Sequence, residues 1–134
     1  MVRMGRGAAW GGVGLYCCLI FFVSSQSDLP LPEGASEIDK LAHMLEYAVL
    51  GWLFALALRQ ERPQLSRGWL LFFSVVFVVV FGASDEWHQA HVPGRYADRL
   101  DFWADLSGGV LGACGYVGWL EWWRRGGRPL IVLS

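Results

Sequence analysis

The sequence has few charged residues and few cysteines, and both shortages restrict what the chain can be. Asp, Glu, Lys and Arg make up 17% of its 134 residues, whereas a soluble domain carries about 25%. The three cysteines, Cys17, Cys18 and Cys114, all lie inside apolar runs, so neither a disulfide framework nor a zinc-ligand spacing is expected. The chain also has no internal repeat and no low-complexity segment.

Apolar residues make up 54% of the chain and gather in four runs, at residues 8–23, 41–58, 68–83 and 106–123. Each run is near the lower limit for crossing a ~30 Å hydrocarbon core at about 1.5 Å per residue. Even the valine-rich third run should be helical, because lipid offers no partner to an open backbone group. The sequence therefore predicts an all-α membrane protein, a single domain over residues 1–134. Its four transmembrane helices are expected at about 8–24, 39–59, 67–89 and 101–123.

The arginines indicate an orientation for this bundle. With the N-terminus in the cytoplasm, the outer side carries only three basic residues, Lys40, Arg95 and Arg99, and the inner side carries the other eight of eleven. Basic residues concentrate in the cytoplasmic loops of membrane proteins, so both termini are predicted to be cytoplasmic. Because topology accounts for these residues, no nucleic-acid partner is expected.

The first apolar run has two interpretations. A basic start, an apolar middle and the sequence Ser24-Ser25-Gln26 are also typical of a signal peptide, which would be cut after Ser25. The run is long for a signal peptide, so a retained helix is favoured. Under either interpretation the residues that follow lie outside.

Two sets of polar residues lie at the outer ends of apolar runs. In the first set, Asp39, His43 and Tyr47 share a helix face by their spacing, and Lys40 and Glu46 lie beside them. An ionisable residue as deep as Glu46 normally faces the bundle interior. The second set begins at Asp85 and Glu86, continues with His88, Gln89 and Arg95, and ends at Asp101. His91 is expected to be exposed.

The fourth run combines carboxylates with glycines. Asp101 and Asp105 are four residues apart and stack on one helix face, and Gly108, Gly112 and Gly115 continue that side. A stripe of small residues lets another helix approach closely. The partner helix is either in the same chain or in a second copy, so a homo-oligomer through this helix is possible.

These motifs resemble those of the VanZ-like family. Asp39-Lys40-x-x-His43 with Glu46-Tyr47-x-x-Leu50-Gly51 is similar to its first motif. Its second motif resembles Asp85-Glu86-x-x-Gln89-x-x-x-Pro93-Gly94-Arg95 followed by Asp101. The chain departs from the pattern at Asp105, where the family usually has Asn. The resemblance implies a small multi-pass protein of the bacterial inner membrane, in a family named after a protein of a glycopeptide-resistance cluster associated with teicoplanin resistance.

Three interpretations of the polar residues remain open. In a structural network, Lys40 and Arg95 neutralise the carboxylates, and His43 hydrogen-bonds Glu46 or Tyr47. In an enzyme, Arg95 holds a phosphate or carboxylate of a lipid-linked substrate, and Glu86 or His88 is the general base. In a binding protein, an anionic envelope lipid or cell-wall precursor is recognised at the outer face without being transformed.

The residues chosen as the site are the same under the last two interpretations. Glu86, His88 and His43 are the candidate catalytic residues. Candidates for substrate binding are Arg95, Gln89, Lys40, Asp101, Asp85 and Asp105. No cofactor is predicted, because no metal-ligand spacing is diagnostic. A less favoured alternative is a bundle metal site of His43 and Glu46 with Glu86, His88 and Asp101 or Asp105.

Overall fold

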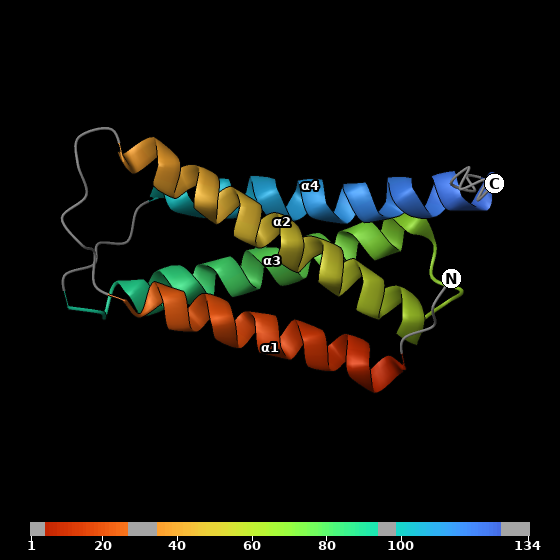
Figure 1. Cartoon of the computed structure of the whole chain (residues 1–134), viewed down its shortest axis with the longest axis horizontal. Helices are drawn as coiled ribbons and strands as arrows, with labels where there is room; N and C mark the ends of the chain where they lie inside the picture. The colour runs from red at the N-terminus through yellow and green to blue at the C-terminus, as the bar shows by residue number, and fades with distance from the viewer. Residues whose placement is uncertain (1–4, 27–34, 94–98, 127–134) are drawn as a thin grey trace, which may run out of the picture.

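The computed structural model describes residues 5–26, 35–93 and 99–126, and within these ranges the chain is entirely helical apart from turns. The four helices are α1 (Arg6–Ser24), α2 (Ala35–Glu61), α3 (Arg67–Gln89) and α4 (Arg99–Arg124). Figure 1 shows that successive helices run in opposite directions along one long axis. This confirms the all-helical prediction, and each boundary falls within four residues of the expected position. The largest difference is at α2, which begins earlier than expected.

The alternating direction gives the bundle two chemically different ends. We call the end where α1 and α3 finish and α2 and α4 begin the polar end. The opposite end, where α1 and α3 begin and α2 and α4 finish, is called the arginine end (Figure 1). At the arginine end, Arg59 of α2 donates from Nη1 to the carbonyl oxygens of Pro63 and Leu65, at 2.9 and 2.8 Å, and so holds the turn into α3. Arg67 of α3 forms an ion pair with Glu121 of α4 there.

Helices α2 and α4 pack against each other backbone to backbone. A Cβ added at Gly108 would overlap the backbone carbonyl of Met44, and one added at Gly112 would overlap that of Ala48. Both glycines are buried. The buried part of the predicted small-residue stripe therefore contacts α2 of the same chain. Self-association through the fourth helix stays a prediction, and Gly115 and Gly118 are exposed on it.

Side-chain contacts attach α1 and α3 to this pair. Ile20 of α1 and Val78 of α3 join Tyr47 and Leu50 of α2 in one buried cluster near the middle of the bundle. A second cluster nearer the arginine end includes Leu70 of α3, together with Ala55, Ala113, Tyr116 and Val117 of α2 and α4. The core therefore runs along the axis and leads to the polar end.

The outer surface of the bundle is strongly apolar. Three helices, α1, the part of α2 from Ile38 to Glu61, and α3, are long and apolar enough to cross a membrane by length and composition. Large apolar side chains are exposed on all four helices, for example Leu15, Leu45, Val80 and Leu111. So much exposed apolar surface is unusual for a water-soluble monomer and suits contact with lipid.

Candidate functional site

Polar side chains from all four helices gather at the polar end of the bundle. The helix ends bring together residues more than 60 positions apart in the chain, because α1 and α3 end where α2 and α4 begin. The described polar side chains that make up the candidate site are Ser24 and Ser25 of α1; Asp39, Lys40, His43, Glu46 and Tyr47 of α2; Asp85, Glu86, His88 and Gln89 of α3; and Asp101 and Asp105 of α4.

Asp85 is the centre of a buried hydrogen-bond network. Its Oδ2 accepts from Ser24 Oγ at 2.9 Å and from Gln89 Nε2 at 3.1 Å, with Tyr47 OH at 3.5 Å. Gln89 also donates to Ser24 Oγ at 3.3 Å. Asp85 and Gln89 are each 1% exposed. Because Asp85 and Gln89 are four residues apart on α3, one helix face presents both to α1 and α2.

His43 and Asp105 form a second buried pair, between α2 and α4. His43 Nδ1 donates to Asp105 Oδ1 at 3.0 Å, and the side chains are 9% and 1% exposed. The hypothesis of a structural network had His43 hydrogen-bonding Glu46 or Tyr47 of its own helix, whereas the observed partner is Asp105 of α4. Spacing along α2 indicated those partners. The close approach of α2 and α4 at the glycines instead places an α4 carboxylate beside the ring.

Three carboxylate groups at this end have a buried oxygen with no hydrogen-bond partner among the residues that the structure describes. These oxygens are Asp85 Oδ1, Glu86 Oε1 and Asp105 Oδ2. A buried polar atom without a partner costs about 1–3 kcal/mol, and more if charged. Such atoms often mark the place where a protein contacts a ligand, an ion or a proton. Each of these oxygens can accept a hydrogen bond that the described residues do not supply.

The other two histidines differ in their surroundings. His88 is partly buried, its Nε2 lies 2.8 Å from Ser25 Oγ, and its ring packs on Phe21 of α1. His91 is exposed, as expected, and donates from Nδ1 to the carbonyl oxygen of Trp87. Among the residues that the structure describes, His88 contacts a second helix and His91 contacts its own helix alone.

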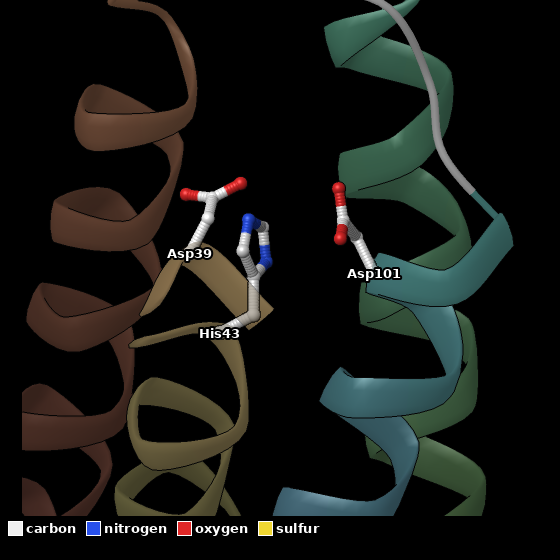
Figure 2. A group of neighbouring side chains, drawn as sticks. All are labelled: Asp39, His43 and Asp101. Atoms are coloured by element: carbon white, nitrogen blue, oxygen red, sulfur yellow. The ribbon is translucent and has the colours of Figure 1, made fainter. Parts of the chain in front are cut away.

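Asp39, His43 and Asp101 form a compact group with metal-ligand chemistry. Each residue offers one ligand atom, and these atoms all lie within 4.8 Å of one another. Figure 2 shows the Asp39 carboxylate and the Asp101 carboxylate on opposite sides of the His43 ring, with Asp101 reaching in from α4. An imidazole and two carboxylates are ligands that divalent metals accept.

The structure brings together eight of the nine residues selected from the sequence. Glu86, His88, His43, Gln89, Lys40, Asp101, Asp85 and Asp105 all lie at the polar end. Arg95 lies outside the described residues. Ser24 and Ser25 are not among the residues predicted from the sequence, although they contact Asp85 and His88. Two polar residues directly after the first apolar run were the available signal, but they also fitted a cleavage site.

The chain was compared with known proteins by family, by sequence and by structure. Residues 14–121 match the family model described as VanZ/LLP1. No curated protein and no solved structure matches the chain. The match begins within α1 and extends into the last turns of α4, so it includes all the site residues above.

Proposed function

The chain belongs to the VanZ/LLP1 family and is a membrane protein, and on this premise we propose its placement and its function. We propose that all four helices cross the bacterial inner membrane, with both termini in the cytoplasm. The polar end then faces the extracytoplasmic side, where it recognises or processes an anionic envelope lipid or a cell-wall precursor. A contribution to glycopeptide resistance is part of this proposal.

Exposed tryptophans support four crossings, including that of α4. On α4, Trp103 and Trp122 are both exposed and lie nineteen residues apart, which is about 28 Å at 1.5 Å per residue. On α3, Trp69 and Trp87 are exposed and eighteen residues apart, about 27 Å. Tryptophans concentrate at the two membrane–water interfaces, and both separations are close to the ~30 Å of a hydrocarbon core.

The distribution of basic residues supports the orientation. Among the described residues, the arginine end carries six arginines and the polar end carries only Lys40 and Arg99. Short cytoplasmic segments are rich in Arg and Lys, which supports a cytoplasmic position for the arginine end. The six are Arg6, Arg59, Arg62, Arg67, Arg124 and Arg125.

The observation that carries the proposed activity is the convergence of all four helices on one set of buried polar groups with spare binding capacity. An internal network alone would need no unpartnered carboxylate oxygens, yet Asp85, Glu86 and Asp105 each have one within the described part of the chain. Intramembrane ionisable groups are costly and usually mark a pathway or a ligand site. Hydroxyl or amine groups of a headgroup would donate to these oxygens.

Basic side chains bind the anionic group of the ligand, and a carboxylate acts as general base if the ligand is processed. Lys40 and Arg95 supply positive charge for a phosphate or carboxylate, and the planar guanidinium of Arg95 allows a two-pronged contact. If the ligand is processed, Glu86 is the best-placed general base, because its Oε1 has no hydrogen-bond partner among the described residues. His43 and His88 are less available, since each already has a side-chain partner.

Native mass spectrometry of the gently extracted protein tests this function. The wild type is expected to carry a reproducible lipid-sized adduct, and Arg95→Ala is expected to lose it. Arg99→Ala is the matched control, because it removes the same charge from an exposed position at the start of α4. If the wild type carries no specific adduct, or if both variants lose it equally, recognition of an anionic group by Arg95 is wrong.

A second candidate function is purely structural, and the Asp85 network favours it for part of the site. Ser24, Gln89 and Tyr47 all direct polar atoms at one oxygen of Asp85, which ties α1, α2 and α3 together. Under this candidate, the lipid adduct is absent and Asp85→Asn lowers stability without any other effect. The two candidates therefore predict different results for the same purified protein.

A further inference from the structure

We propose that Asp39, His43 and Asp101 bind a divalent transition-metal cation at the polar end. Their ligand atoms lie within 4.8 Å of one another. Zn²⁺ lies about 2.0–2.2 Å from imidazole nitrogen and carboxylate oxygen ligands. Because the three ligand atoms are already close together, small side-chain rotations would bring each of them to that distance from one central cation. Figure 2 shows Asp39 and His43 on α2 and Asp101 on α4, with the Asp101 carboxylate on the side of the His43 ring away from Asp39.

The helices hold these ligands in place before any ion binds. Asp39 and His43 are four residues apart on α2 and share one face, while Asp101 comes from the first turn of α4. The contacts of Gly108 and Gly112 with the α2 backbone fix the two helices against each other. The metal site is therefore built on the most closely packed helix pair of the fold.

Asp105 supplies a second, independent indication of a bound cation. It is 1% exposed and accepts from His43 Nδ1, which leaves Nε2 as the ring nitrogen for a metal. A carboxylate that orients a histidine in this way is the usual second contact of a metal-bound imidazole. The other oxygen of the same buried carboxylate, Oδ2, has no hydrogen-bond partner in the described ranges, 5–26, 35–93 and 99–126.

The charge balance at the polar end also favours a cation. Among the side chains that the structure describes, this end carries six acidic residues against two basic ones, Lys40 and Arg99. Asp105, Asp101 and Asp39 all act electrostatically on His43. A divalent cation would offset this excess of negative charge. The acidic residues are Asp39, Glu46, Asp85, Glu86, Asp101 and Asp105.

The ligand set indicates the kind of ion. Mg²⁺ and Ca²⁺ prefer oxygen ligands alone, whereas an imidazole with carboxylates suits Zn²⁺, Mn²⁺ or Fe²⁺, of which Zn²⁺ binds a given site more tightly than Mn²⁺ or Fe²⁺. Three protein ligands leave a fourth position open. If the proposed function holds, a phosphate or carboxylate of the envelope ligand takes that position. Binding of the metal itself does not require the envelope lipid or precursor.

Isothermal titration of the full chain tests the site. The protein is purified in detergent without an affinity tag, stripped with a chelator and titrated with ZnCl₂ in the absence of lipid. We expect one Zn²⁺ per chain, not displaced by excess Mg²⁺. Asp39→Asn should remove most of the affinity, and Asp105→Asn should weaken it about 10–100-fold. His91→Ala is the matched control, an exposed histidine at the same end, and should bind as the wild type does.

Three results would overturn the proposal: no stoichiometric binding by the wild type, equal loss in His91→Ala, or wild-type affinity in Asp39→Asn. Asp39 is only half-buried and lies near the start of α2, so Asp39→Asn remains informative even if Asp105→Asn does not fold. The lipid and metal proposals fail separately. Zinc binding without a lipid adduct refutes the proposed function alone, and a lipid adduct without zinc binding refutes the metal site alone.

Discussion

Replacing Gly112 by alanine tests the backbone contact between α2 and α4. An added Cβ would lie 2.7 Å from the carbonyl carbon of Ala48 and 2.9 Å from its Cα. These are backbone atoms, so they cannot rotate away as the end of a flexible side chain can. The two helices would have to separate along their shared face.

The expected cost follows from two opposing effects. Overpacking a tight contact typically costs about 1–3 kcal/mol, and a clash with backbone places Gly112→Ala near the upper value. Alanine is a better helix former than glycine by about 1 kcal/mol, which offsets part of the loss. The net destabilisation is therefore about 2 kcal/mol, or a fall in Tm of about 8 °C at roughly 4 °C per kcal/mol for a chain of this size.

Gly118→Ala is the matched control on the same helix. A Cβ there meets nothing within 4 Å, so this variant keeps the gain in helix propensity without the clash. It should melt at or slightly above the wild-type temperature. The two variants are then expected to differ by about 3 kcal/mol, which is the sum of the net loss at Gly112 and the gain at Gly118.

Thermal unfolding in detergent, followed by tryptophan fluorescence, measures this difference. The signal reports on the right interface because Trp52 of α2 packs on Tyr116 and Trp119 of α4, with ring centroids 5.6 and 6.0 Å apart. If Gly112→Ala melts within about 2 °C of Gly118→Ala, a difference worth less than about 0.5 kcal/mol, the two backbones are not in contact at Gly112.

Two further predictions concern α1 and the orientation. Ser24→Ala removes a hydrogen bond to the buried Asp85 carboxylate and should cost about 1.5–3 kcal/mol in the same melts. An equal effect of Ser107→Ala, whose exposed hydroxyl donates to the carbonyl oxygen of Trp103 on its own helix, would refute this. In a cysteine-free background, His91→Cys at the polar end should react with a membrane-impermeant maleimide in intact cells. Ser66→Cys at the arginine end should react only after permeabilisation, and the reverse pattern would invert the orientation.

The sequence predicted the helices well because each is specified locally. Long apolar runs separated by Pro, Gly and charged residues define four segments whatever their packing, and Ser66 caps α3 by accepting from the backbone N–H of Trp69. The grouping of most site residues at one end was also predictable, because helices that alternate in direction bring every second boundary to the same end. These conclusions need only composition and spacing.

The partners within the site could not be predicted in the same way. Asp105 contacts His43 because the glycines of α4 allow a close approach to α2, and the sequence left open whether those glycines face α2 or a second copy. Ser24 contacts Asp85 across 61 positions, a distance over which local spacing carries no information. Pairing between helices depends on how each rotates about its own axis, and a single sequence specifies that rotation only weakly.

The contacts of the α4 glycines with the α2 backbone also fix how far along the bundle axis the site residues of α4 lie relative to those of α2. Gly112 lies seven residues below Asp105 on α4, or about 10 Å along the axis, and it meets the α2 backbone at Ala48. Sliding α4 by one residue would move it about 1.5 Å and turn it by about 100°, which would present Leu111 or Ala113 to Ala48 and take Asp105 away from His43. Gly108 and Gly112, which lie deeper in the bundle, thus determine the height at which the His43 imidazole and the Asp105 carboxylate meet.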